Sequence, residues 1–528
     1  MTSITFYGGV STIGGNCVVI EENGTRIMID NGMCFAKENA YYKDFLYPRS
    51  NNDIRDYIEL GLVPEIPGIY GEDKINDIYL SEATKESEYL FKTEITSYEE
   101  YLEKNDSPYI SALFLSHCHL DHARNIKFMH PDIPIYCSAA TKQLLHIISD
   151  LSDDDFLHYC FVKTKERTNR SYFPDELYKD KCYEDRIIKV INPGNVIEIP
   201  ENEGVFQVKG HPVDHSVPGG IAFEIFTKEG KSIVYSGDIR FHGKEYGKKK
   251  SHSFLDNITN HPDALISEGT RIDDDTEMSE HDVYVNMINM LNRDDYLSKK
   301  LIMASFPWKS ISRFKTLYEV SKELNRVLVI QPKLAYTLHN LQSFTPLNIK
   351  DILANDDLKI YLPRKSSMIY SMDDYKSTKF NLSYSTDWNR DEQIELYTIE
   401  YGDKIHLKAY EIKNNPSKYI LHLNFYDLNE LIDLQPPEGS YLFNLKTEPF
   451  DERGELEEKV LLNWISKFNL QYEMEDYHAS GHASGKDLRD MIHKIAPKRL
   501  FPVHTERPDL FEFENAEIDI EKGKKYTI

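Results

Sequence analysis

The sequence contains few cysteines, and no two of them form a C-x-x-C pair. The six are Cys17, Cys34, Cys118, Cys137, Cys160 and Cys182. A disulfide framework needs cysteines at paired, regular spacings, and this scattered set offers none. We therefore expect reduced thiols and a cytoplasmic protein.

Long apolar runs and N-terminal targeting features are missing as well. No stretch approaches the ~20 apolar residues that cross a membrane. The segment Met1–Phe6 has neither a basic region nor an apolar signal core. These absences predict no membrane partner.

Positive charge is also in short supply, because 62 Lys and Arg face 87 Asp and Glu, for a net charge of −25. This balance argues against a large sequence-independent surface for nucleic acid. It does not exclude a local one, since two divalent ions and a few lysines can make a single cleft positive.

What the chain does have is enough length and apolar content for a sizeable core. Its 528 residues predict two or three domains. A hydrophobic content of 40% and a charged content of 28% are typical of soluble globular proteins.

The most informative stretch has the sequence S-H-C-H-L-D-H and follows the apolar run 112–115, which predicts a short buried strand. Alternate residues near a strand end project to the same side, so His117 and His119 can bind one metal ion. Asp121 and His122 lie on the turn beyond and can reach a second ion. Imidazole and carboxylate ligands suit zinc, and manganese less well. A histidine-rich surface loop would explain one histidine but explains this cluster poorly.

Other apolar strands end in a potential ligand too. Asp30 follows 26–29, Asp238 follows 232–236 through a glycine, Glu268 follows 264–267, and His504 follows 498–503. Each of these residues alone has an ordinary alternative as a cap or a turn residue. Together with the histidine motif, five such strand ends predict a site at one edge of a sandwich.

Two further segments carry candidate residues. In 210–220 either His211 or His215 can be a ligand, and their spacing leaves the choice nearly even. In 477–485 small residues lead into a predicted amphipathic helix, and free amides at a helix N-terminus form an anion pocket. Glycine-rich loops of this kind are more often plain turns, but this one stands sixteen residues before P-V-H-T-E.

The H-x-H-x-D-H motif resembles that of the metallo-β-lactamase superfamily, and the later motifs resemble the β-CASP nucleases, which include ribonuclease J and the mRNA 3′-end processing endonuclease. The resemblance implies an αββα sandwich with an inserted α/β domain. It assigns His215 as the third-motif histidine, because this histidine stands in a similar His-Ser-x-Pro setting. It implies that Asp238 bridges two zinc ions, with manganese as the alternative, and that Asp30 supports the metal histidines from behind.

The ligand sets that the resemblance implies are His117, His119 and His215 for one metal and Asp121, His122 and His504 for the other, with Asp238 shared. Paired ions lower the pKa of a bridging water and clamp the phosphoryl oxygens during in-line attack. Asp121 is therefore also a catalytic candidate.

The β-CASP motifs imply that Glu268 orients His482, which protonates the leaving oxygen. We expect the amides of Ser480, Gly481, His482, Ala483 and Ser484, with the Ser305 hydroxyl, to hold a phosphate. A pocket for a 5′-monophosphate would give a 5′-to-3′ exonuclease. RNA is favoured over DNA because β-CASP enzymes acting on RNA have a histidine at the position of His504.

The expected organisation is a first sandwich part at 1–272, an inserted domain at 273–472 and a return to the sandwich at 473–528. The 273–276 segment with 278–293 predicts a cap and a helix, and 310–325 predicts a second helix. The insertions 36–105 and 150–190 carry no motif. Their tyrosines could stack on bases, but packing onto the domain is the better explanation.

Two departures from ribonuclease J matter. Leu120 precedes Asp121 where an acidic residue is usual, and the sequence stops soon after its last strand, which leaves monomer and homodimer both open. The main prediction is a ribonuclease that acts on single-stranded RNA. A DNA nuclease, a hydrolase of small esters or thioesters, and a catalytically silent scaffold are the alternatives.

Overall fold

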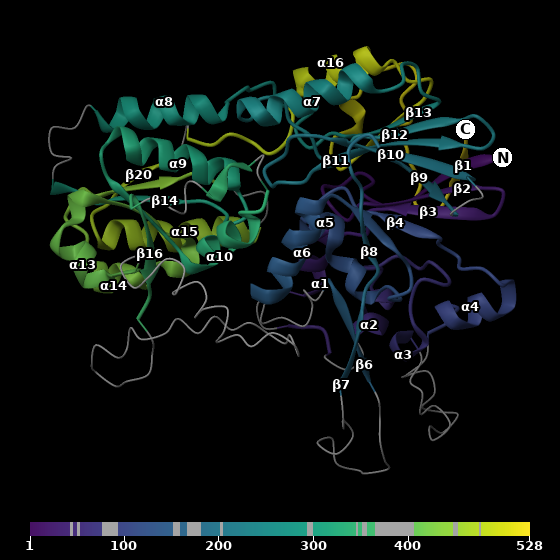
Figure 1. The fold of residues 1–528 in the computed structure, drawn as a ribbon, viewed down its shortest axis with the longest axis horizontal. Coiled ribbons are helices and arrows are strands. Elements are labelled where there is room, and N and C mark those ends of the chain that lie inside the picture. Colours follow the sequence, from purple (N-terminus) through teal and green to yellow (C-terminus); the bar gives the residue numbers. More distant parts are fainter. Residues whose placement is uncertain are drawn as a thin grey trace, which may run out of the picture.

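The computed structural model describes residues 1–42, 46–49, 53–75, 93–151, 159–165, 181–200, 204–292, 299–344, 347–350, 356–364, 406–446, 452–474 and 477–528. Its described strands form two sheets stacked as a sandwich, a third sheet in a separate lobe, and a small hairpin (Figure 1). No described helix is long and apolar enough to cross a bilayer.

The first sandwich sheet has seven strands and contains both ends of the chain. In spatial order they are β22 (Lys525–Thr527), β1 (Thr2–Gly8), β2 (Cys17–Glu22), β3 (Thr25–Ile29), β4 (Ala112–Phe114), β5 (Ile135–Cys137) and β8 (Ile188–Val190). The turn between β2 and β3 is Asn23-Gly24, both with positive φ, which matches the twist of a two-residue hairpin.

The second sandwich sheet has six strands. They are β21 (Leu500–Val503), β13 (Ala264–Glu268), β12 (Ser232–Tyr235), β11 (Ile221–Thr227), β10 (Phe206–Pro212) and β9 (Val196–Ile199). Apolar side chains of the two sheets, such as Ile29, Phe114, Phe223 and Val503, form one core between them. Because β12, β13 and β21 run parallel, their carboxyl ends come out at the same edge.

Helices cover both outer faces of the sandwich. Helices from the first part of the chain cover the first sheet, and they are α1 (Phe35–Tyr41), α2 (Asp53–Glu59), α3 (Glu72–Ile75), α4 (Tyr98–Asn105), α5 (Leu120–Ala123) and α6 (Ala139–Leu151). Two helices cover the second sheet, α7 (Glu245–Asn257) and α16 (Gly485–Ile495). Within the 36–105 insertion Tyr57 and Tyr70 are buried, as the packing interpretation predicts, whereas Tyr41 and Tyr47 are exposed.

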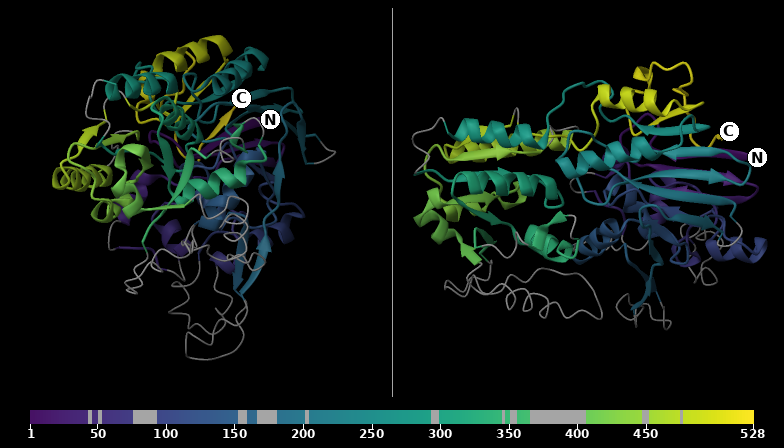
Figure 2. Two further views of the ribbon diagram at one scale, coloured as in Figure 1. Left: turned by 60° about the vertical axis from the view of Figure 1, so that its left-hand side comes forward. Right: turned by 45° about the horizontal axis from the view of Figure 1, so that its top comes forward.

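The second lobe is built on a parallel sheet of seven strands. They are β17 (His406–Lys408), β16 (Leu358–Leu362), β15 (Val327–Ile330), β18 (Tyr419–His422), β14 (Ile302–Ser305), β19 (Tyr441–Asn444) and β20 (Gln471–Glu473). Figure 2 shows this lobe beside the sandwich rather than on top of it.

Helices pack on both faces of this third sheet. One face carries α8 (Glu280–Leu291), α9 (Ile311–Glu323) and α10 (Pro332–Leu341), and the other carries α13 (Ala409–Asn414), α14 (Glu430–Leu434) and α15 (Glu452–Lys467). The helices predicted at 278–293 and 310–325 are confirmed, but the predicted cap is wrong. Ser279, not the 273–276 segment, caps α8 through a capping box with Asp282, because its side chain reaches the third amide of the helix.

The strand order returns to the sandwich after β20, since β21 pairs with β13 and β22 with β1. The hairpin of β6 (Phe161–Lys165) and β7 (Lys181–Asp185) projects from the 150–190 insertion. The fold is thus mixed α/β, with a sandwich and an inserted parallel-sheet lobe, as predicted.

Candidate metal centre

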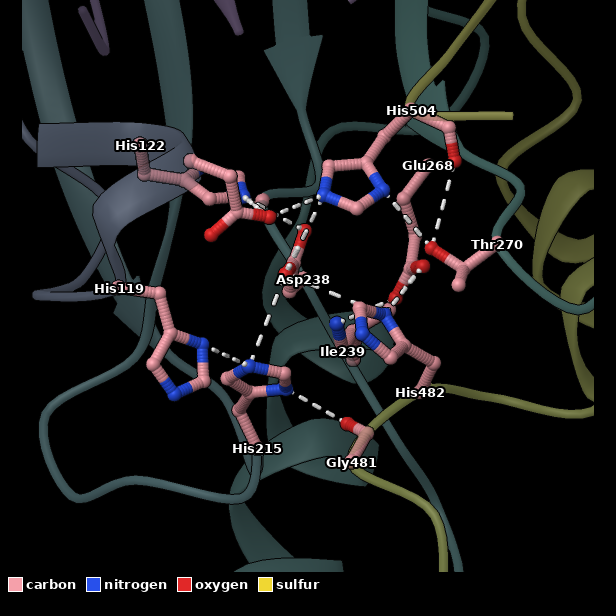
Figure 3. Close-up of polar contacts among 12 residues, drawn as sticks. His119, His122, His215, Asp238, Ile239, Glu268, Thr270, Gly481, His482 and His504 are labelled. Atoms are coloured by element: carbon pink, nitrogen blue, oxygen red, sulfur yellow. Dashed lines mark hydrogen bonds and ion pairs between the residues drawn. The ribbon is translucent and has the colours of Figure 1, made fainter. Parts of the chain in front are cut away.

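The predicted metal-binding side chains gather at one edge of the sandwich. His117 and His119 follow β4, His122 lies in the short helix α5, Asp238 follows β12, and His504 follows β21. Figure 3 shows His119, His122, His215 and His504 around Asp238. They form two groups that share Asp238, one with His117, His119 and His215 and one with Asp121, His122 and His504.

The first group consists of imidazole nitrogens that face one another. The Nδ1 atom of His119 lies 3.0 Å from Nε2 of His117 and 3.0 Å from Nε2 of His215. Both of those Nε2 atoms lie 3.6 Å from Oδ2 of Asp238. Burial lowers the pKa of all three histidines well below the usual imidazole value. Neutral imidazoles whose lone pairs converge on one point suit a metal cation.

The second group also combines imidazoles with carboxylates, but it has two aspartates instead of one. His504 Nε2 lies 3.0 Å from Oδ2 of Asp121, and His122 Nε2 lies 3.2 Å from Oδ1 of Asp238. Burial opposes a charge on His122, but Asp238, Asp30 and Asp121 outweigh it and raise the pKa of this histidine. Burial likewise opposes a charge on Asp238, yet the histidines around it keep the pKa of its carboxyl well below its usual range.

The clearest sign that this centre suits a cation is Asp238 itself. Its side chain is buried, and among the described residues neither carboxylate oxygen accepts a hydrogen bond of good geometry. A buried carboxylate without donors is costly unless a cation neutralises it. The residues present therefore fit a metal site, and this cluster of histidines and aspartates is of the kind that binds zinc.

Hydrogen bonds behind the ring fix the orientation of four histidines. His117 Nδ1 faces Ser116 Oγ at 3.0 Å, and His122 Nδ1 faces Asp30 at 2.7 Å. His215 Nδ1 donates to the Gly481 carbonyl at 2.6 Å, and His504 Nδ1 faces the Thr270 hydroxyl at 2.9 Å. Such bonds select the tautomer and aim the other nitrogen at a metal.

Asp30, the predicted support, is fully buried and accepts several hydrogen bonds. Ser116 donates both its amide and its hydroxyl, at 2.7 and 2.8 Å, and the hydroxyl of Tyr235 donates at 2.7 Å. Sequence reasoning missed Tyr235 and Thr270 because a single hydroxyl two or three residues from a motif carries no pattern of its own.

Two glycines, Gly14 in the N-terminal loop before β2 and Gly32 after β3, let the chain pass close to Asp121. A Cβ atom on Gly32 would lie 1.6 Å from the Asp121 carbonyl oxygen, and one on Gly14, at φ +80°, would lie 2.8 Å from the Asp121 side chain. Only glycine fits there.

Glu268 and His482 lie in contact with each other, as predicted from the sequence. His482 Nδ1 lies 2.8 Å from Oε2 of Glu268, whose Oε1 accepts the Ile239 amide at 2.8 Å. Burial would lower the pKa of His482, but Glu268 and then Asp238 raise it to about 9. Glu268 therefore favours the protonated form of this histidine.

The two alternatives at 210–220 are separated by the structure. His211 lies on β10 and faces Glu224 at 3.0 Å, away from the centre, whereas His215 is in the first group. Cys118 is buried in the core behind the motif and takes no part in the groups.

The predicted phosphate pocket is less open than expected. The His482 amide donates to Ser480 Oγ at 3.1 Å, and the Ala483 amide donates to the Ile239 carbonyl at 2.6 Å. The Ser484 hydroxyl caps α16 by accepting the Asp487 amide. Two of the five amides are thus already used inside the protein.

Ser305 ends β14 and is buried, and its hydroxyl faces Asn424 at 3.4 Å. This contact turns the hydroxyl toward the lobe's own sheet, where Asn424 follows β18. The role of Ser305 in holding phosphate therefore stays a prediction.

Comparisons with known proteins agree with this geometry. A family model described as "Zn-dependent metallo-hydrolase RNA specificity domain" matches residues 467–523. A ribonuclease J of Pyrococcus abyssi is 21% identical over 99% of this chain and 93% of its own length. A ribonuclease J of Helicobacter pylori is 21% identical over 95% of this chain, which spans 56% of that protein.

A crystal structure of a protein of unknown function from Enterococcus faecalis V583 has the same fold over 100% of both chains, with a TM-score of 0.67 and 21% identity. With the sandwich, the inserted parallel sheet and the two groups around Asp238, these matches place the sequence in a family. The chain belongs to the metallo-β-lactamase superfamily, in its ribonuclease J-like β-CASP group.

Proposed function

We propose that this chain is a dinuclear-metal ribonuclease that hydrolyses RNA phosphodiester bonds, as a 5′-to-3′ exonuclease, an endonuclease or both. The observation that supports it most is the pair of ligand groups sharing one buried carboxylate, Asp238. The match of 467–523 to an RNA specificity domain supports RNA as the substrate, because this stretch contains His482 and His504.

In this proposal His117, His119 and His215 hold one zinc ion, and Asp121, His122 and His504 hold the other, with manganese as the alternative metal. The metals, when bound, supply Lewis-acid stabilisation of the phosphoryl group and an acidified water. Asp238 neutralises both sites, and Asp30 and Thr270 keep their histidines aligned.

His482 supplies the proton that the leaving oxygen needs. Its Nδ1 is engaged by Glu268, so Nε2 is the nitrogen that can donate. Because Glu268 also accepts the Ile239 amide, the carboxylate cannot swing away without losing a second bond. The pair therefore acts as a fixed general acid.

The domain boundaries near 272 and 473 remain part of the proposal, and the strand order supports them, since β14 to β20 form the lobe's own sheet. The cytoplasmic location and the choice between monomer and homodimer also remain predictions. The scaffold alternative would require lost ligands, and every predicted ligand is at the centre.

The deciding experiment is cleavage of one 3′-labelled RNA that carries either a 5′-monophosphate or a 5′-hydroxyl, beside the matching DNA. We expect mononucleotides from the monophosphate RNA, or internal fragments regardless of the 5′ group. His119→Ala should abolish both, whereas His211→Ala is a matched control outside the centre. RNA that stays intact with metal bound would refute the ribonuclease and direct tests to DNA and small esters.

A further inference from the structure

A hollow lies beside the loop that carries His215, and His215 is one of its lining residues. Its walls are the 213–219 segment, the first two turns of α7 from the sandwich, and the first turn of α9 from the lobe. Figure 1 shows α7 on the side of the sandwich that faces the lobe. The hollow has a volume of about 520 Å³, part of which is open solvent.

Three lysines line this hollow in a chain of net charge −25, namely Lys244 and Lys250 on the α7 side and Lys315 on α9. Lys244 pairs with Glu319 on the exposed rim at 2.6 Å. Lys250 lies 4.5 Å from the ring centre of Tyr246, and within the described residues neither Lys250 nor Lys315 forms an ion pair. Two of the three lysines thus have no ion-pair partner among the described residues, although Glu319 favours the charge of Lys315 and Asp214 that of Lys250.

The acidic residue in the wall, Asp214, offsets the charge of Lys250 only in part, because burial still lowers the pKa of this lysine. Asp214 Oδ2 also accepts a hydrogen bond from Nε of the buried Arg240 at 2.8 Å, so two cations share this carboxylate. Helix α9 starts at Ile311, which lines the hollow beside Ser312 and places the positive end of a 13-residue helix there.

Gathering these ammonium groups is unfavourable without an anion. Burial lowers the pKa of Lys315, and repulsion from Lys244 and Lys250 lowers it further, against the attraction of Glu319. Burial also lowers the pKa of Lys250. A cluster of like charges with perturbed pKa values in a hollow is a candidate functional site.

We propose that Lys244, Lys250 and Lys315 form an anion subsite that binds a phosphate group next to the metal centre. It rests on the proposed function, because the phosphate would belong to an RNA strand crossing the lobe junction or to a released nucleotide. His215 lines the hollow and also belongs to the first metal group, so the subsite adjoins the centre, where it would bind a phosphate other than the one being cleaved.

The test is binding by the full chain with Lys250→Gln and Lys315→Gln, alone and together. Lys249→Gln is the matched control, because Lys249 is exposed on the same helix and outside the hollow. Fluorescent single-stranded RNA is titrated in a His119→Ala background so that it stays intact. AMP and inorganic phosphate are titrated separately by calorimetry.

An RNA backbone phosphate predicts about tenfold weaker RNA binding by the double variant, since each charge-assisted hydrogen bond to a phosphate contributes strongly. The slope of log K against log salt should also become less steep by about 0.7 for each phosphate that the variant no longer neutralises. A free nucleotide or phosphate predicts weaker AMP or phosphate binding with unchanged RNA affinity. Either result supports the subsite and identifies its source.

Equal affinities of the double variant and Lys249→Gln for RNA, AMP and phosphate would overturn the proposal. The double variant and Lys249→Gln should both keep the melting temperature of the wild type, because removing lysines that repel one another does not unfold the chain. If the wild type binds no RNA, the proposed function fails, and the AMP and phosphate titrations still decide the subsite.

Discussion

A network of buried charges next to the 477–485 segment, which carries His482, gives a quantitative prediction. Glu280, the first residue of α8, is 1% exposed, and its carboxylate lies 3.1 Å from Nε of Arg313 and 3.8 Å from Nη1 of Arg240. Thr316 donates to it at 2.8 Å. Arg313 in turn donates to the carbonyls of Tyr477 and Ala479. Glu280 therefore positions Arg313, which in turn is hydrogen-bonded to the 477–485 segment.

Replacing Glu280 by glutamine keeps the shape and removes the charge. Burial would raise the pKa of Glu280, but Arg313 and then Arg240 lower it from 4.5 to about 2. A pKa difference of this size corresponds to about 3 kcal/mol, and breaking a buried pair from one side costs ~3–5 kcal/mol. We expect Glu280→Gln to lower the free energy of unfolding by about 3 kcal/mol at pH 7.

The sign of the pH dependence follows from the depressed pKa. The stability that the Glu280 charge contributes is fully present above its unfolded pKa of 4.5, and it is lost as pH falls through the folded pKa of about 2. The difference between wild type and Glu280→Gln should thus be constant from about pH 7 to 5 and shrink below pH 4.5.

Urea unfolding followed by circular dichroism measures this difference. Glu277→Gln is the control, since Glu277 forms an exposed pair with Lys486 and its removal should cost ~1 kcal/mol or less. A loss below about 1 kcal/mol for Glu280→Gln, or a difference that does not shrink between about pH 4.5 and 3, would refute this account.

Three further predictions concern the centre. Zinc should raise the melting temperature of the metal-free wild type but not that of Asp238→Asn, measured by calorimetry; an equal rise in both would place zinc elsewhere. Tyr235→Phe removes one donor to Asp30 and should weaken zinc affinity about tenfold in a chelator competition, with an unchanged affinity contradicting the role of Asp30. His482→Gln should lower kcat by about 10²-fold or more. Because Glu268 raises the pKa of His482, the loss of rate at high pH should move to lower pH in Glu268→Gln. An unchanged dependence of kcat on pH would exclude His482 as the general acid.

The sequence predicted which side chains gather at the sandwich edge where the information is local. His117 to His122 stand within one strand end and one turn, and Asp238, Glu268 and His504 each follow an apolar strand whose direction the pattern reveals. Because β12, β13 and β21 are parallel neighbours, these strand ends had to meet. The family resemblance then supplied the metal assignments.

What depends on register or on single contacts could not be predicted. His211 and His215 belong to the same short segment, and it takes the pairing of β10 with β11 and the contact of His211 with Glu224 to show that His211 lies outside the centre. The use of the His482 and Ala483 amides depends on Ile239 and on Ser480, which no spacing rule connects with the loop. The lysine hollow joins α7 and α9, whose proximity requires the lobe to dock.

The pairing of the two ends of the chain has a consequence for biosynthesis. Strand β22 completes the sheet that β1 begins, and β21 delivers His504 beside β13, a strand made long before it. A ribosome that still holds the segment from β21 onward therefore carries a chain without a full second ligand group. The second ligand group is therefore complete only after β21 has been made and has paired with β13.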